Sequence, residues 1–105
     1  MNEVNYLNES NFDAEVLESP VPVLVVFTSV LCSPCQRLKP VLDELSSDLG
    51  NTGKVVAVEI TVNERLAERY GIAALPSMLV FRNGREIHRL VGLKTKDYLR
   101  EALAA

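Results

Sequence analysis

The sequence has no long apolar run and no run of basic residues. Its longest apolar stretch, Val21–Phe27, contains Pro22 and is far shorter than the roughly 20 residues that a membrane-spanning helix needs. The formal net charge is only -3, and Lys, Arg, Asp and Glu are mixed along the chain. These features argue against a membrane span and against a surface for nucleic acid or anionic lipid as the main function.

Cysteine and histidine are also scarce. The chain has two cysteines, Cys32 and Cys35, and one histidine, His88. A structural zinc site needs about four ligands, so two thiols and one distant imidazole disfavour a metal. A purely structural disulfide would add little, because the loop it closes is very short, although inert cysteines remain an alternative. We expect no metal site and leave His88 out of the functional site.

Separate units are absent as well, since no internal repeat, low-complexity tract or Gly/Ser/Pro-rich linker interrupts the sequence. At 105 residues, with 48% apolar and 24% charged residues, the chain has the size and balance of one soluble globular domain spanning residues 1–105. The first ten residues are polar and acidic, with neither a basic start nor an apolar stretch. This start is unlike a secretory signal and favours a cytoplasmic protein.

The apolar patterning predicts alternating helices and strands. Ser10 is expected to cap a first helix that ends before Pro20. The run Val21–Thr28 is apolar at odd and even positions alike, which indicates a central strand covered on both faces. Leucines and valines from Leu38 to Leu49 recur at helical spacing, with Gly50 as the stop and a kink expected at Pro40.

The second half of the chain predicts a strand, a hairpin and two more helices. A β-branched run forms the strand, Asn63 caps a short helix, and Thr95 caps the last one. The dipeptide Asn83-Gly84 supplies a two-residue hairpin turn between two antiparallel strands. The expected ranges are strand 55–61, helix 63–70, strands 77–82 and 86–91, and helix 95–104. The fold class is therefore α/β, with a mixed sheet of four to five strands flanked by about four helices.

The two cysteines follow the predicted central strand and begin the next helix as Cys32-Ser33-Pro34-Cys35. Unpaired N–H groups and the dipole at a helix start stabilise an anion, which favours a thiolate at Cys32 as the nucleophile. Cys35, one turn later, can attack the mixed disulfide and resolve it. Pro34 suits the first helical turn, and Ser33 with Pro34 is expected to tune the redox potential.

Further short motifs follow the cysteine pair in a fixed order. The set comprises Val23-Leu24-Val25-Val26-Phe27, Cys32-Ser33-Pro34-Cys35, Pro40, Tyr70-Gly71-Ile72, Leu75-Pro76-Ser77, Phe81-Arg82-Asn83-Gly84 and Val91-Gly92. With these motifs the chain resembles the thioredoxin family over nearly its whole length. The resemblance implies a thioredoxin fold and a monomer that reduces protein disulfides. It also implies re-reduction by a thioredoxin reductase, with NADPH as the indirect electron source and no bound cofactor.

The resemblance also implies a groove for the target protein. The Leu75–Pro76 peptide bond would be cis and lie beside the cysteine pair, where the Leu75 backbone receives an extended target. The groove residues carried over from the family are Leu31, Ala74, Leu75, Pro76, Val91 and Gly92. An ordinary strand-start proline at Pro76 is the alternative.

The sequence departs from the family's usual pattern around the cysteines. Leu31 and Ser33 stand where Trp and Gly are usual, and Thr28 replaces another tryptophan. The family's buried aspartate aligns with Val26, and its lysine partner aligns with Ala57. The usual proton acceptor for Cys35 is therefore missing, which should slow resolution near neutral pH or leave the proton to water.

We hypothesise that Glu59, two residues beyond Ala57 on the same strand face, partly replaces the missing acid. A hydroxyl at Thr28 or Ser29 is expected to bond to backbone rather than to act at the sulfurs. Two functional alternatives stay open. One is a disulfide oxidant or isomerase, and the other is a binding module with this fold and weak turnover.

Overall fold

Five strands form one mixed sheet in a computed structural model that describes residues 4–105; residues 1–3 lie outside the described part. The strand order is β1-β3-β2-β4-β5, with β1 and β2 parallel to β3, and with β4 antiparallel to both β2 and β5. The strands are β1 (Asn5–Leu7), β2 (Val23–Thr28), β3 (Lys54–Glu59), β4 (Ser77–Arg82) and β5 (Arg85–Val91). The mixed sheet is the expected one, with β2 at its centre.

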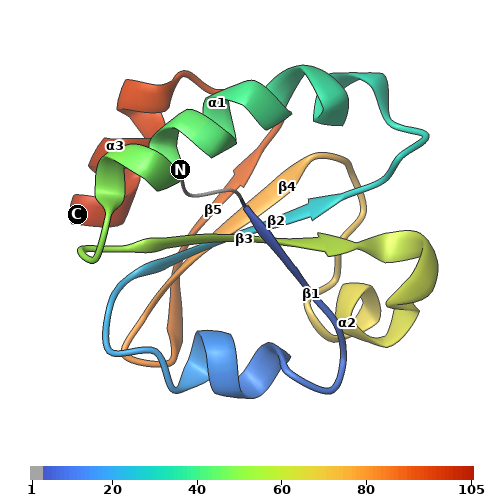
Figure 1. The fold of residues 1–105 in the computed structure, drawn as a ribbon. Coiled ribbons are helices and arrows are strands. Elements are labelled where there is room, and N and C mark those ends of the chain that lie inside the picture. Colours follow the sequence, from blue (N-terminus) through green and yellow to red (C-terminus); the bar gives the residue numbers. More distant parts are fainter. Residues whose placement is uncertain (1–3) are drawn as a thin grey trace.

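Helices cover both faces of this sheet (Figure 1). The long helices α1 (Ser33–Leu49) and α3 (Lys96–Ala104) pack on one face. The short elements η1 (Asp13–Leu17) and α2 (Glu64–Arg69) pack on the other, and η2 (Ile60–Val62) is a 3₁₀ turn after β3. The three-layer arrangement agrees with the predicted fold class.

The central strand β2 supplies side chains to two separate cores. Val23, Val25 and Phe27 belong to the core beneath η1 and α2, while Leu24 and Val26 belong to the core beneath α1 and α3. Every residue of β2 is buried. Alternate side chains of a strand point to opposite faces, so a strand buried on both faces must be apolar at consecutive positions. The prediction for this strand is confirmed.

The hairpin turn is also confirmed. Strands β4 and β5 are joined by Asn83 and Gly84, whose φ angles are 54° and 78°. Positive φ at both central residues is the conformation of the tight hairpin turn that Asn-Gly favours. Gly84 is further constrained, because a Cβ there would lie 2.8 Å from the carbonyl oxygen of Leu17.

The start of the chain differs from the prediction. Ser10 does not cap a helix; instead Oδ1 of Asn8 accepts hydrogen bonds from the N–H groups of Ser10 and Asn11, at 2.9 and 3.2 Å. The element that follows, η1, is a short π-helical turn rather than a regular helix. Strand β1 had not been predicted; parallel pairing of Asn5, Tyr6 and Leu7 with β3 holds it in place.

Three other element ends differ from the prediction. Residues 60–62 form η2 rather than the end of a strand, and the side chain of Asn63 donates to the Glu59 carbonyl instead of capping α2. Strand β2 begins at Val23 rather than at Val21. Helix α1 continues through Pro40, the position of the predicted kink. Thr95 caps α3 as predicted, accepting a hydrogen bond from the Tyr98 N–H at 3.1 Å.

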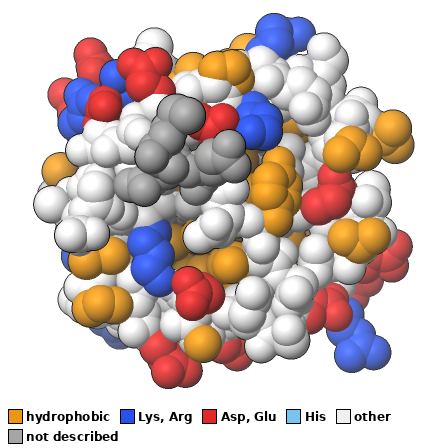
Figure 2. All heavy atoms as spheres, viewed as in Figure 1, with side chains coloured by type: hydrophobic (Ala, Val, Ile, Leu, Met, Phe, Trp, Pro, Cys, Tyr) orange, Lys and Arg blue, Asp and Glu red, His pale blue; other side chains and the backbone are white. Residues whose placement is uncertain are grey.

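Charged side chains of both signs lie near one another in small groups on the face seen in Figure 2. Ion pairs also join the two long helices, since Lys96 on α3 pairs with Glu44 and Asp48 on α1. Among residues 4–105, no helix combines the length and the apolar character needed to cross a bilayer.

Candidate active site

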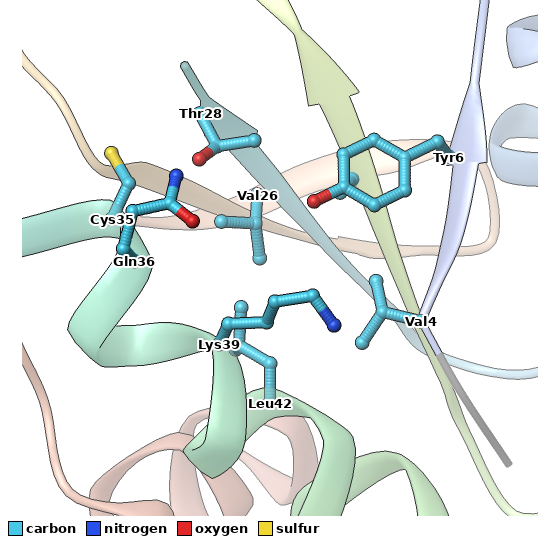
Figure 3. A pocket seen from close by; sticks show the side chains of 9 residues that line it. Val4, Tyr6, Val26, Thr28, Cys35, Gln36, Lys39 and Leu42 are labelled. Carbon is cyan, nitrogen blue, oxygen red and sulfur yellow. The ribbon is translucent and has the colours of Figure 1, made fainter. Parts of the chain in front are cut away.

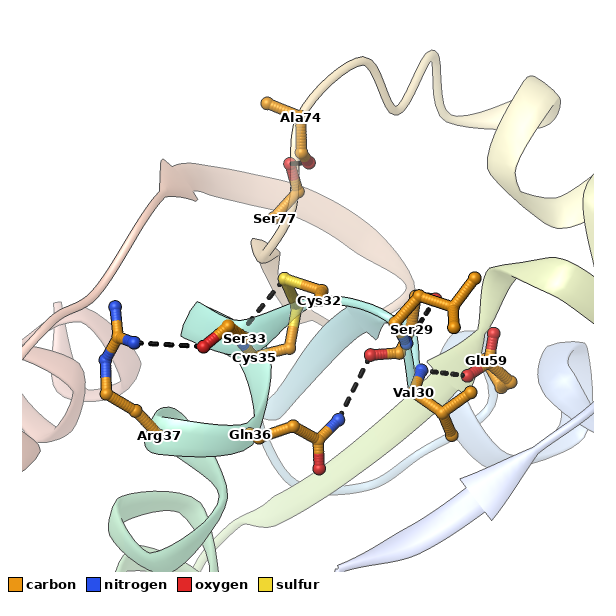
Figure 4. The surroundings of a disulfide bond; sticks show 11 residues. Ser29, Val30, Cys32, Ser33, Cys35, Gln36, Arg37, Glu59, Ala74 and Ser77 are labelled. Atoms are coloured by element: carbon orange, nitrogen blue, oxygen red, sulfur yellow. Dashed lines mark hydrogen bonds between the residues drawn. A yellow bond between two sulfur atoms is a disulfide. The ribbon is translucent and has the colours of Figure 1, made fainter.

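Cys32 and Cys35 form a disulfide at the start of α1, with their Cα atoms 5.2 Å apart (Figure 4). The segment leaves the carboxyl end of β2 at Thr28 and enters the helix at Ser33. Pro34 lies in the first helical turn, where the missing N–H of proline costs no helical hydrogen bond. The strand and the helix thus place the two sulfurs together, at the position that the sequence predicted.

Cys32 is the N-cap residue of α1. Its backbone is extended, with φ -96° and ψ 109°, and its Sγ accepts a hydrogen bond from the Cys35 N–H at 3.2 Å. This N–H belongs to the first turn, where N–H groups have no acceptor within the helix, and it is directed at the sulfur. The positive end of the helix dipole lies behind the same sulfur. The same contact would stabilise a thiolate at Cys32 after reduction.

The two sulfurs differ in burial. Cys35 is only 4% exposed, whereas Cys32 is half-buried. An incoming disulfide meets the more accessible sulfur first, and the buried one is available for the intramolecular step that follows. The roles of nucleophile and resolving residue stay predictions, and this difference in access supports them.

The loop before Cys32 is held by the buried residue Ser29. Its carbonyl accepts from the Cys32 N–H and from the Gln36 side chain, each at 3.1 Å. Its hydroxyl accepts from the Leu31 N–H, also at 3.1 Å. As expected, this hydroxyl bonds to backbone rather than to a sulfur.

A positive charge lies close to the residue between the two cysteines. The guanidinium of Arg37 donates to the Ser33 hydroxyl at 3.1 Å, one helical turn away (Figure 4). Both side chains are at the surface. Ser33 therefore presents a hydroxyl and a neighbouring cation beside the disulfide.

The carboxylate of Glu59 accepts hydrogen bonds from the backbone of two segments. Its Oε1 accepts from the Val30 N–H at 2.7 Å, and its Oε2 accepts from the N–H and hydroxyl of Thr61 at 2.8 and 2.7 Å. Partial burial acts to raise the pKa of Glu59, but the hydrogen bonds from Thr61 and Val30 outweigh it and lower the pKa. A carboxylate held in this way is a weaker proton acceptor, so these contacts make Glu59 a residue that anchors the loop and do not support its hypothesised role as a base.

The position behind Cys35 is apolar. Val26 and Ala57 pair in register across β2 and β3, are 1% and 2% exposed, and line one cavity together with Cys35 (Figure 3). They present only methyl groups to this space. The proton acceptor expected from the resemblance is therefore absent at these two positions.

A hydrogen bond joins two of the three segments that contain the predicted groove residues. The Leu75–Pro76 peptide bond is cis, and the Pro76 carbonyl accepts from the Gly92 N–H at 2.9 Å. Ser77 pairs with Val91 on β5 and with Phe27 on β2, one residue before the strand end that leads to the cysteines. Pro76 and Gly92 therefore lie at the same end of the sheet as the disulfide.

Two of the other predicted groove residues are exposed, and a third is held by a hydrogen bond to its own segment. Leu31 is 86% exposed and Val91 is 54% exposed, and the Ala74 carbonyl accepts from the buried Ser77 hydroxyl at 2.6 Å. Figure 4 shows Ala74 and Ser77 above the disulfide in that view. Orange side chains also lie at the edge of Figure 2 where Figure 1 places the loop after β2. Leu31 and Val91 therefore present apolar surface at this end of the sheet.

Comparison with known proteins assigns the chain to a family. The family model described as Thioredoxin matches residues 3–105. The chain belongs to the thioredoxin family. The predicted resemblance and the predicted thioredoxin fold are confirmed, and the protein is a disulfide oxidoreductase of the thioredoxin type.

Curated relatives cover almost the whole chain. A protein named Thioredoxin from Rickettsia felis is 39% identical over 95 residues, which are 90% of each chain. Thioredoxin 1 from a Nostoc species is 37% identical over 97 residues, 92% of this chain and 91% of the relative. The Thioredoxin of Haemophilus influenzae is 31% identical over 99 residues, 94% of this chain and 92% of the relative.

Two features near the disulfide are not predicted by the sequence analysis. The bond from Val30 to Glu59 joins residues 29 apart, and only the pairing of β2 with β3 brings them together. Lys39 lines the cavity behind Cys35 from the next turn of α1. The spacing of four residues on a predicted helix was a usable signal for this second placement.

Proposed function

We propose that this thioredoxin-family protein reduces disulfide bonds in other proteins, with Cys32 as the nucleophile and Cys35 as the resolving residue. The observation that carries the proposal is the contact of Cys32 Sγ with the Cys35 N–H at the start of α1, combined with the burial of Cys35. Electrons enter from NADPH through a thioredoxin reductase, and the protein acts as a monomer in the cytoplasm. The reducing cytoplasm keeps such dithiol pairs reduced and active.

The reaction proceeds in two exchanges. The Cys32 thiolate attacks one sulfur of the target disulfide, forms a mixed disulfide with it and releases the other target sulfur as a thiolate. The Cys35 thiolate then attacks Cys32 Sγ, forms the Cys32–Cys35 bond and releases the second target thiolate. Two electrons pass to the target, whose thiolates take protons from solvent.

Target binding is assigned to the groove beside the disulfide. The residues proposed to line it are Leu31, Ala74, Leu75, Pro76, Val91 and Gly92. The bond between the Gly92 N–H and the Pro76 carbonyl, the exposure of Leu31 and the cis Leu75–Pro76 peptide bond support this assignment. Ser33 and Pro34, between the cysteines, adjust how readily the disulfide is reduced.

Trapping the mixed disulfide tests the assignment of the two cysteines. Reduced Cys35→Ser protein, incubated with a disulfide-bonded protein, should accumulate a covalent complex through Cys32 that mass spectrometry identifies. Cys32→Ser is the matched control and should accumulate none. Equal trapping by both variants would refute the assigned order.

One observation favours a second candidate function. Because Val26 and Ala57 leave no carboxylate behind Cys35, a slow second exchange would leave a protein that mainly holds its partners. Such a binding module would keep its target affinity when both cysteines are replaced by serine. Loss of binding in the double-serine variant would exclude it.

A further inference from the structure

Strand β5 is bonded to both ends of the groove loop, residues 71–76, which leads from α2 to β4 and contains three of the predicted groove residues. At the end of this loop, the Gly92 N–H donates to the Pro76 carbonyl at 2.9 Å. Just before its start, the guanidinium of Arg89 donates to the Tyr70 carbonyl at 2.7 Å. The other wall of the predicted groove is the carboxyl end of β5 itself. These two hydrogen bonds therefore tie the two walls of the groove together.

Few other contacts hold the groove loop. The Ile72 N–H donates to a carbonyl of α2 at 2.9 Å, and the Ala74 carbonyl accepts from the Ser77 hydroxyl at 2.6 Å. Ile72 and Leu75 also pack against the core beneath η1 and α2. Within residues 4–105, the backbone of Leu75 forms no hydrogen bond, so its N–H and carbonyl remain for another chain. The placement of this backbone depends on how the two ends of the loop are held.

A β-bulge in β5 directs Arg89 towards the end of α2. Residues three apart on a regular strand point to opposite faces of the sheet, yet Glu86 and Arg89 meet on the same face. The register between β4 and β5 shifts at Ile87, which is the extra residue of the bulge. The partners of Glu86 and Arg89 on β4 are Phe81 and Leu79. Both partners belong to the core beneath η1 and α2, so the bulge places both charged side chains on the face that carries α2.

Glu86 aligns the guanidinium of Arg89. Nε and Nη2 of Arg89 donate to the two oxygens of the Glu86 carboxylate at 2.8 and 2.9 Å, which leaves Nη1 directed at the Tyr70 carbonyl. The side chains of Arg89 and Glu86 are 40% and 30% exposed, so solvent screens this pair only in part. Tyr70 is held from its other side as well, because its ring contacts three phenylalanines of the core. The start of the groove loop is thus fixed between the core and β5.

We propose that Arg89 is a positioning residue for target binding, which fastens the groove loop to β5 and so holds the backbone of Leu75 ready for an extended target segment. The inference rests on the proposed function, because it concerns the recognition of a protein disulfide. Arg89 takes no part in the bonds that form and break at Cys32. Loss of one charge-assisted, partly exposed hydrogen bond is expected to weaken target binding about threefold, since the target must then order the loop as it binds.

Reduction of two disulfides of different size separates this role from a general loss of activity. Insulin must place a peptide segment in the groove, whereas dipyridyl disulfide is small and neutral and needs access only to Cys32. Arg89→Met retains most of the aliphatic stem and should raise the KM for insulin about threefold with kcat unchanged. The rate of dipyridyl disulfide reduction should stay at the wild-type value, which also shows that the variant is folded and that its disulfide site is intact.

Two further variants control for charge. Arg85→Met removes a positive charge from the other end of β5 and should leave both substrates at their wild-type rates. Arg89→Lys keeps the charge but lacks the planar fork that bonds Glu86 and Tyr70 together, so its KM for insulin should approach that of Arg89→Met. An unchanged KM for insulin in Arg89→Met, or equal slowing with both disulfides, would overturn the role of Arg89 alone. Absence of insulin reduction by the wild type would overturn the proposed function and this inference with it.

Discussion

The Glu59 carboxylate accepts the Val30 N–H at 2.7 Å and so fastens the end of β3 to the loop that leads into Cys32. The same side chain holds Thr61 at the start of η2. Two segments that meet only in the folded protein are joined by one charged group. The shape of the loop before the nucleophile therefore depends on a residue outside the Cys-Ser-Pro-Cys segment.

Replacing Glu59 tests this anchoring. Glu59→Ala removes both acceptor oxygens and should lower the free energy of unfolding by about 1 kcal/mol at pH 7, whereas Glu59→Gln keeps one oxygen and should cost less. The folded-state pKa of Glu59 lies below its ordinary value of 4.5. Its contribution is therefore complete above that pH and is lost as the pH falls through the lowered value. Urea unfolding at neutral and acidic pH should show the difference between wild type and Glu59→Ala shrinking in acid.

The Glu59→Gln protein also tests the alternative role as a base. We expect the pH profile of disulfide exchange to be the wild-type one, because the carboxylate is occupied by backbone donors. A profile displaced along the pH axis would instead support a proton-accepting role for Glu59.

Sequence patterns predict the parts of the fold that depend on residues close together in the chain. Val23–Thr28 has apolar residues at odd and even positions and forms the buried centre of the sheet. Asn83 and Gly84 adopt the positive φ angles that a tight hairpin turn requires. The short strand β1 could not be recognised, since three residues carry too little pattern and their strand geometry comes from pairing with β3. Asn63 illustrates another limit, because a nearby carbonyl competed successfully for the side chain expected to cap α2.

The candidate site also has a part that the sequence predicts and a part that it does not. The spacing of Cys32 and Cys35, and their position between one strand and one helix, are enough to predict the cysteine pair. The contact between Glu59 and Val30 needs a register between two strands, which the sequence does not display. The cavity beside Lys39 needs the packing of α1 on β1, and β1 had not been foreseen.

The hairpin glycine gives a second test of the fold. In Gly84→Ala the new Cβ would lie 2.8 Å from the Leu17 carbonyl oxygen, at a φ of +78°. Gly71 is the matched control, because its φ is +62° and a Cβ added there would meet open space. Gly71→Ala should cost about 1 kcal/mol of backbone strain, and Gly84→Ala should cost at least about 2 kcal/mol. Equal losses in denaturant unfolding would show that the contact with Leu17 relaxes freely.

The charge cluster between α1 and α3 predicts a dependence on pH and salt. Hydrogen bonding to Lys96 is the main cause that lowers the pKa of Asp48, and bonding to Asp48 is the main cause that raises the pKa of Lys96. The ordinary values are 3.8 for Asp48 and 10.5 for Lys96. The ion pair therefore stabilises the fold between these values; its contribution is lost as the pH falls through the lowered pKa or rises through the raised one.

Lys96→Met should cause a small loss of thermal stability at neutral pH and low salt, because the pair is partly exposed to solvent and screened by it. The difference from wild type should fade in high salt and at acidic pH. A loss that persists unchanged in high salt would mean that Lys96 acts through packing rather than through charge.

The most direct test of the account is the turnover of a protein disulfide driven by NADPH and a thioredoxin reductase. The intact protein should consume NADPH catalytically as the target is reduced, and Cys32→Ser should abolish consumption without altering the fold. Absence of turnover in the intact protein, with Cys32 nevertheless alkylated rapidly, would contradict a reductase supplied by this route. That result would favour an oxidant with another electron partner or a protein that binds its targets without reducing them.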